Sequence, residues 1–162
     1  MDQGQLSPHI CWVDTHYCVA TWDRVLIQIW RLEVTAEAVQ NLRRIGKQFV
    51  AETSGPLSML SIVEASSPPP NEPLRAALSA FFRELAPRME LQIVVAEGSG
   101  FRAALVRSVG VALSAIARGA LPFKFCGHVA DAAALIRPHL SPSAGGAEAL
   151  LGAIHDVRAK IP

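Results

Sequence analysis

Apolar and polar positions along the chain form blocks that predict strands and helices in turn. Residues 17–22 (YCVATW) and 25–30 (VLIQIW) are rich in aromatic and β-branched side chains, and only Asp23 and Arg24 separate them. This pattern predicts an antiparallel hairpin. The second segment is apolar at both odd and even positions, which is expected of a strand that helices cover on both faces.

After the hairpin, short apolar segments typical of strands alternate with longer segments that have the apolar spacing of a helix. Helices are predicted where apolar residues recur every three to four positions, with Thr35, Asn71 and His128 at the cap positions of three of them. The predicted strands lie at residues 57–63, 91–96 and 122–126, and the predicted helices at residues 35–50, 71–85, 101–117 and 128–137.

This order predicts an α/β sandwich with a five-stranded, mostly parallel sheet that begins with an antiparallel hairpin. Four helices pack on the sheet, and an extra helix follows at the C-terminus. Residues 1–16 are predicted to be an N-terminal arm with some extended structure at 10–13, and residues 17–140 the α/β domain. The Ser, Pro and Gly content of residues 141–146 predicts a flexible linker, and residues 147–162 an amphipathic helix.

Composition narrows the function classes. The chain has 162 residues, enough for one domain with a core, and a net charge of +1 without a Lys/Arg cluster. Such a charge pattern argues against nucleic acid or an anionic membrane surface as the partner. The polar start MDQGQLSP is unlike a secretory signal, and no apolar run is long enough to span a bilayer. Three cysteines without a scaffold spacing predict reduced thiols and a cytoplasmic location.

The element order of residues 17–140 resembles the STAS domain, the fold of anti-sigma-factor antagonists. The segments 30–35 (WRLEVT), 97–104 (EGSGFRAA) and 107–109 (RSV) are similar to those of a divergent bacterial branch that is common in myxobacteria. The resemblance implies a regulatory domain that works through protein–protein contact. Some relatives of this fold bind apolar ligands, which makes a small-molecule or lipid carrier the alternative.

The well-studied members of that family carry an Asp-Ser-Ser/Thr-Gly motif, in which a partner kinase phosphorylates the second hydroxyl residue. The matching stretch here is Ala65-Ser66-Ser67-Pro68, in which the two hydroxyls align but the acid and the glycine are replaced. Proline fixes φ and lacks an N–H, so this loop cannot copy a glycine-dependent turn. Ser66 and Ser67 therefore form a degenerate version of the phosphorylated loop. A phosphate there would lie near a helix N-terminus.

Gly98, Ser99 and Gly100 follow a predicted buried strand and open a helix, the arrangement in which free backbone N–H groups bind anions. Arg102 adds a positive charge in the first turn. The third glycine of a dinucleotide fingerprint is absent, and no acidic residue follows about 20 positions later. The other interpretation is a plain strand-to-helix turn in which Glu97 pairs with Arg102.

Two His-x-Cys pairs raise the question of a metal. His9 with Cys11 and His16 with Cys18 repeat at a seven-residue interval, and each pair lies on one face of an extended segment. Four such donors would suit tetrahedral zinc, but the spacing matches no established zinc pattern. We therefore expect neither a metal nor another cofactor, and expect Cys126 to act as a small buried hydrophobic residue.

The sequence contains the serine, histidine and aspartate residues that a hydrolase uses, but not in the usual sequence motif. Ser66, Ser67 or Ser99 would have to meet His128 and Asp131 at the carboxyl ends of the parallel strands. No G-x-S-x-G elbow is present, and His128 is explained as a helix cap. We therefore expect a non-catalytic protein and rank a small hydrolase third.

Apolar surface is the remaining functional signal. The predicted helix at 101–117, the Phe81-Phe82 pair and the C-terminal helix offer more apolar faces than a small domain needs, and such faces usually mark protein contacts. The expected interface, with a protein partner or a second copy, is the edge from 66 to 78 or the helix at 101–117. Its candidate residues are Leu74, Arg75, Leu78 and Phe82. Two alternatives remain open: a ligand pocket lined by Phe81, Phe82 and the helix at 101–117, and a last helix that simply covers one face of the sheet.

Overall fold

The computed structural model describes residues 6–100, 104–109 and 123–162. Six strands form one sheet in the order in which they occur along the chain. The first three are antiparallel neighbours, and the third to the sixth run parallel. The strands are β1 (His9–Val13), β2 (Tyr17–Trp22), β3 (Val25–Trp30), β4 (Leu57–Val63), β5 (Met89–Ala96) and β6 (Phe123–Cys126).

The prediction of five strands is one short, because β1 lies within the segment expected to be an arm. β1 pairs with β2 through a register irregularity between Ile10 and Trp12. The indole nitrogen of Trp22 also donates a hydrogen bond of 2.7 Å to the carbonyl oxygen of Leu6, which ties the chain before β1 to the sheet. Backbone pairing with an exposed edge thus makes a strand of a segment whose own pattern is weak.

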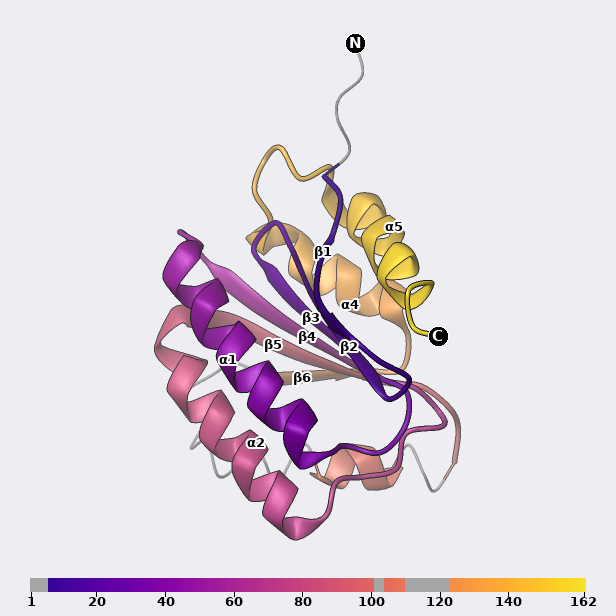
Figure 1. The fold of residues 1–162 in the computed structure, drawn as a ribbon. Coiled ribbons are helices and arrows are strands. Elements are labelled where there is room, and N and C mark those ends of the chain that lie inside the picture. The colour runs from indigo at the N-terminus through magenta and orange to yellow at the C-terminus, as the bar shows by residue number, and fades with distance from the viewer. Residues whose placement is uncertain (1–5, 101–103, 110–122) are drawn as a thin grey trace.

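The helices lie on both faces of the sheet. Figure 1 shows α1 and α2 on one face, and α4 and α5 on the other. The described helices are α1 (Ala36–Glu52), α2 (Glu72–Leu85), a helical segment at 104–109, α4 (Val129–Ile136) and α5 (Gly146–Arg158), with short 3₁₀ turns η1 (Ala86–Arg88) and η2 (Arg137–His139). Of the helix expected at 101–117, residues 101–103 and 110–117 lie outside the described residues.

Capping side chains explain where two of the helices begin. The hydroxyl oxygen of Thr35 accepts a hydrogen bond from the backbone N–H of Ala38, and the side-chain oxygen of Asn71 accepts one from Leu74. Both caps were predicted. His128 occupies the expected cap position of α4, but its side chain makes no capping hydrogen bond.

Each face of the sheet has its own apolar core. Leu42, Phe49 and Phe81 belong to the core under α1 and α2, while Leu150 and Val157 of α5 are fully buried in the core on the opposite face. The C-terminal helix therefore covers one face of the sheet. No helix among the described residues is both long and apolar enough to cross a membrane.

The segment between α4 and α5 is attached to the sheet. Ser141 donates two hydrogen bonds to the carboxylate of Asp23 in the β2–β3 turn, one from its backbone N–H (2.8 Å) and one from its hydroxyl (2.6 Å). Ala144 is buried in the core under α5. The composition of residues 141–146 is that of a linker, and these contacts hold it against the domain.

Candidate ligand pocket

A pocket lies on the α1/α2 side of the sheet, between α2, the helical segment at 104–109 and strands β3 to β6. It is partly open to solvent. Its described lining residues are Gln28, Trp30, Val34, Ser61, Val63, Ser67, Pro68, Pro69, Pro70, Leu78, Phe82, Val94, Val106, Val109 and Phe123. Most of them are apolar, as is usual for a small-molecule site.

A polar pair forms part of the pocket wall. Gln28 of β3 lies directly beside Ser61 of β4 in the parallel register. The hydroxyl of Ser61 donates a hydrogen bond of 3.2 Å to the side-chain oxygen Oε1 of Gln28. The amide nitrogen Nε2 of Gln28 is buried and has no hydrogen-bond partner. A buried N–H group without a partner costs about 1–3 kcal/mol, so its presence here requires an explanation.

The ring of Trp30 forms an aromatic wall of the pocket and packs against a second aromatic ring. The Trp30 ring stacks on the Tyr17 ring with the centroids 5.2 Å apart and the planes 13° from parallel. Tyr17 is itself 1% exposed, so the stack belongs to the core. The pocket therefore has at least one wall that does not need a ligand in order to form.

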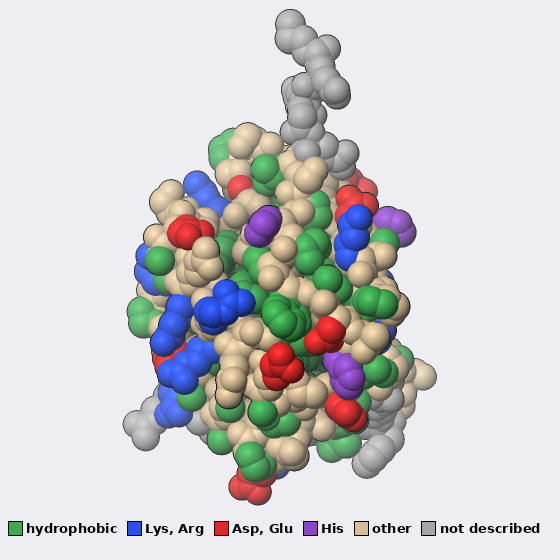
Figure 2. Space-filling view, viewed as in Figure 1, with side chains coloured by type: hydrophobic (Ala, Val, Ile, Leu, Met, Phe, Trp, Pro, Cys, Tyr) green, Lys and Arg blue, Asp and Glu red, His purple; other side chains and the backbone are tan. Residues whose placement is uncertain are grey.

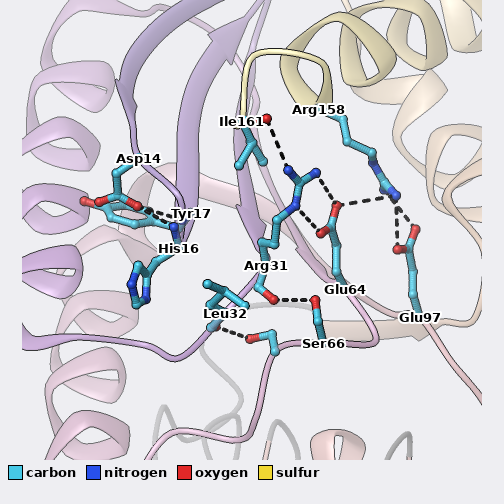
Figure 3. A network of polar contacts seen from close by, with 11 residues as sticks. Asp14, His16, Tyr17, Arg31, Leu32, Glu64, Ser66, Glu97, Arg158 and Ile161 are labelled. Atoms are coloured by element: carbon cyan, nitrogen blue, oxygen red, sulfur yellow. Dashed lines mark hydrogen bonds and ion pairs between the residues drawn. The ribbon is translucent and has the colours of Figure 1, made fainter.

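The loop after β4 forms the rim, and it contains both serines of the degenerate motif. The Ser67 hydroxyl donates a hydrogen bond of 2.7 Å to the carbonyl oxygen of Leu32, and only 1% of Ser67 is exposed. The Ser66 hydroxyl donates to the carbonyl oxygen of Arg31, and Ser66 is exposed (Figure 3). Ser67, which aligns with the phosphorylated residue of the motif that this stretch resembles, is thus buried, while Ser66 is exposed.

Charged residues at the ends of the parallel strands form a network (Figure 3). Arg31, which follows β3, binds Glu64, which follows β4, with N···O distances of 2.8 and 3.3 Å. Arg158 of α5 donates to Glu97, after β5, at 3.1 and 2.8 Å. Glu97 therefore has Arg158 as its partner among the described residues, and Arg102, the partner suggested from the sequence, lies outside them.

The turn Gly98-Ser99-Gly100 has backbone conformations that favour glycine. Gly98 has φ +100° and Gly100 has φ +76°. A Cβ atom on Gly98 would lie 3.2 Å from the Cβ of Ala65 in the neighbouring loop. The backbone N–H of Ala104 donates to the carbonyl oxygen of Gly100 at the start of the helical segment. These requirements of a strand-to-helix turn explain both glycines without a ligand.

The candidate catalytic residues are not joined. The hydroxyls of Ser66 and Ser67 are engaged with carbonyl oxygens, as described above. No hydrogen bond within the described residues links Ser99 to His128 or Asp131. The pairing that would activate a serine nucleophile is therefore not formed in this arrangement.

The two His-x-Cys pairs are spread over the sheet. His9 and Cys11 of β1 border a polar hollow beside α1, and Cys18 of β2 is fully buried in the core on the α4/α5 side. Burial raises the pKa of the Cys18 thiol to about 12, which disfavours the thiolate that a metal requires. Across the described residues, no group of three or more His, Cys, Asp or Glu side chains is placed to hold a metal ion.

The four candidate interface residues divide into two classes. Leu78 and Phe82 are each 6% exposed and line the pocket, whereas Leu74 and Arg75 are half-buried. Phe81 is fully buried in the core and is not a lining residue. In Figure 2 the hydrophobic side chains are scattered among polar ones. The exposed large hydrophobic residues in the described ranges are Leu6, Val13, Leu32 and Leu105.

Sequence reasoning missed Gln28 and Ser61. The available signal was a single polar residue in each of two strands that are otherwise apolar on that face, VLIQIW and LSMLSIV. A polar residue at such a position normally indicates a solvent-facing side. In this sheet, helices cover both faces, so the same residue is buried.

Comparison with known proteins adds no family assignment. No family model matches the chain, and a search of curated proteins found no match. The geometry of the pocket and of its rim therefore carries the functional conclusion.

Proposed function

We propose that the chain is a non-catalytic, STAS-like domain that binds a small, mostly apolar molecule in the pocket above β3 and β4. The observation that carries this proposal is a mostly apolar pocket whose wall contains Gln28, a buried residue whose amide nitrogen has no hydrogen-bond partner. A bound ligand that accepts a hydrogen bond would satisfy this group. The order of elements from β2 to α4 supports the likeness to STAS domains, which rests on the sequence resemblance.

Binding of an uncharged fluorescent probe tests this function. N-phenyl-1-naphthylamine fluoresces strongly in apolar surroundings and weakly in water. We expect the full chain to bind it saturably, with one probe per chain. Val63 is partly buried and lines the pocket, so Val63→Phe would fill the space and weaken probe binding about tenfold or more.

The matched control makes the same substitution elsewhere in the sheet. Val13 of β1 is 37% exposed and is not among the lining residues, so Val13→Phe should bind the probe as the unmodified chain does. Equal binding by Val63→Phe and the unmodified chain would contradict the proposal. So would the absence of saturable binding to the unmodified chain.

A second candidate function is protein contact at the pocket rim. Leu32 is 38% exposed, and its carbonyl oxygen is bound by Ser67, so it lies beside the exposed Ser66. The exposed leucine next to the accessible serine is the contact point that we propose for a protein partner or a second copy of this chain. Leu74 and the charged Arg75, both half-buried, lie in the first turns of α2.

Native mass spectrometry of the purified chain and of its complexes tests this second function. We expect Leu32→Asp and Arg75→Glu to weaken a dimer or a protein complex, while Val13→Asp on β1 leaves it intact. Complexes that survive both rim substitutions would contradict contact at this edge.

We also propose that the protein acts in the cytoplasm, which is supported by the absence of disulfides among Cys11, Cys18 and Cys126.

A further inference from the structure

The pocket described above has a chemical selectivity that its lining residues define. None of the described lining residues is Lys, Arg, His, Asp or Glu. Arg31 and Glu64, at the ends of β3 and β4, are paired with each other, and Arg31 also binds the C-terminal segment. An ion that entered this pocket would lose its hydration without gaining a countercharge from the described lining residues, which is strongly unfavourable.

Two uncharged polar groups lie together in the pocket wall. The amide nitrogen of Gln28 has no hydrogen-bond partner, and the hydroxyl of Ser61 donates its proton to Gln28 Oε1. The pair thus offers one donor and one acceptor side by side. If the Gln28 amide is rotated by half a turn, the donor and the acceptor exchange places and the pair remains uncharged.

Burial makes this pair selective. Gln28 is 1% exposed and Ser61 is 5% exposed, so neither group has water as an easy alternative partner. Val94 lies directly beside Ser61 on β5, and Trp30 is two residues from Gln28 on β3, so apolar surface borders the pair. A polar group surrounded in this way strongly favours a ligand that carries the complementary group.

We infer that the pocket binds an uncharged ligand: a mostly apolar molecule with one amide, carbonyl or hydroxyl group, which hydrogen-bonds to Gln28 and Ser61. This inference rests on the proposed function, because it specifies the ligand class of the same pocket. A carboxylate, a phosphate or an ammonium group would find no countercharge among the described lining residues, so we do not propose a fatty acid anion or a phospholipid headgroup as the ligand.

A series of eight-carbon compounds tests the charge selectivity directly. Octanamide, 1-octanol, octanoate and octylammonium share an alkyl chain and differ in the polar group. At about pH 7.5 octanoate is an anion and octylammonium a cation. Displacement of N-phenyl-1-naphthylamine from the full chain measures the dissociation constant of each. We expect octanamide and 1-octanol to bind about tenfold or more tightly than both ions.

Two substitutions identify the polar pair as the site of recognition. Gln28→Met keeps the length of the side chain and removes its amide, and Ser61→Ala removes the hydroxyl. We expect each to weaken octanamide binding about fivefold or more, and to change the affinity for the probe less than the affinity for octanamide. Ser79→Ala is the matched control, because Ser79 is a buried serine that binds the carbonyl oxygen of Arg75 away from the pocket.

The outcomes separate this inference from the proposed function. If the probe binds, but neither Gln28→Met nor Ser61→Ala changes its displacement by any of the four compounds, the inference is overturned. The pocket then remains a binding site. Octanoate binding as tight as octanamide binding overturns the inference in the same way. Absence of probe binding to the unmodified chain overturns both. If Gln28→Met fails to fold, as shown by circular dichroism, Ser61→Ala decides the result.

Discussion

Arg158 and Glu97 are 61 residues apart in the sequence, and two hydrogen bonds join their side chains. Arg158 also lies 3.7 Å from the carboxylate of Glu64, which Arg31 holds from the other side. Arg31 in turn donates to the carbonyl oxygen of Ile161, beyond α5. These contacts join the end of the last helix to the carboxyl ends of β3, β4 and β5, next to the loop that forms the pocket rim.

The first prediction concerns this network. Arg158→Met should lower the free energy of unfolding by about 1 kcal/mol, because a two-point Arg–carboxylate pair is stronger than a single contact but this one is partly exposed. Urea denaturation of Arg158→Met, Glu97→Gln and the double variant gives the coupling energy. Arg137→Met, which loses no ion pair in the described part of the chain, should stay within about 0.5 kcal/mol.

Salt provides the check on that result. The coupling energy should fall when the ionic strength is raised to about 1 M, because exposed charges are then screened over a few ångströms. A coupling energy of zero at low salt would mean that the Arg158–Glu97 pair does not contribute to the docking of α5. The apolar face with Leu150 and Val157, and the contacts of Glu64 and Arg31, would then account for its docking.

The second prediction concerns the contact between α1 and α2. A Cβ atom on Gly46 would lie 2.7 Å from a ring carbon of Phe81 and 2.8 Å from a methyl carbon of Leu85. Gly46→Ala should therefore destabilise the protein by about 1–2 kcal/mol, since the overpacking exceeds the helix propensity that alanine gains. Thermal unfolding measures it, with Gln40→Ala on the exposed face of α1 as the control. A stabilised Gly46→Ala would show that Phe81 moves aside at little cost.

The parts of the fold with a regular period could be predicted from the sequence. The hairpin of β2 and β3 is confirmed, as are the caps at Thr35 and Asn71, because local chemistry specifies them. Extended structure was predicted at 10–13 but not a sixth strand of the sheet, because the segment is short and only its pairing with β2 makes it a strand. Its existence depends on a partner that the local sequence does not contain.

The candidate site was less predictable for a related reason. The pocket walls come from four strands, α2, the segment at 104–109 and two loops, so no local pattern contains the site. Phe82 was expected in a pocket wall and is there, whereas Phe81 faces the core instead. Arg158 lies too far along the chain from Glu97 for the sequence to pair them, so the nearer Arg102 was the natural suggestion.

The third prediction distinguishes the two serines of the rim. Ser67→Asp would place a carboxylate where 1% of the residue is exposed, and should cost several kcal/mol of stability. Ser66→Asp, at an exposed position, should cost less than about 1 kcal/mol. Chemical denaturation of both variants measures the difference. Equal stabilities would mean that the loop opens readily, and would bring Ser67 back as a site that a kinase can reach.

The fourth prediction concerns Tyr17 at alkaline pH. Burial raises the pKa of Tyr17 to about 12. In the unfolded chain the phenol titrates near pH 10. Between these values only the unfolded state releases the proton, so the stabilising contribution of the neutral phenol is complete below about pH 10 and is lost as the pH rises. The unmodified chain should lose about 2 kcal/mol more than Tyr17→Phe between about pH 9.5 and 11.5.

Tyr17→Phe isolates this effect, because the pKa of Cys18 is also raised by burial and contributes equally in both proteins. At neutral pH the variant should be at least as stable as the unmodified chain, since the Tyr17 hydroxyl is buried without a hydrogen-bond partner. Tyr17 is the single tyrosine of the sequence, so tyrosinate absorbance reports its titration directly. A midpoint near pH 10 in the folded protein would contradict the prediction, and would mean that water reaches the phenol behind the Trp30 wall of the pocket.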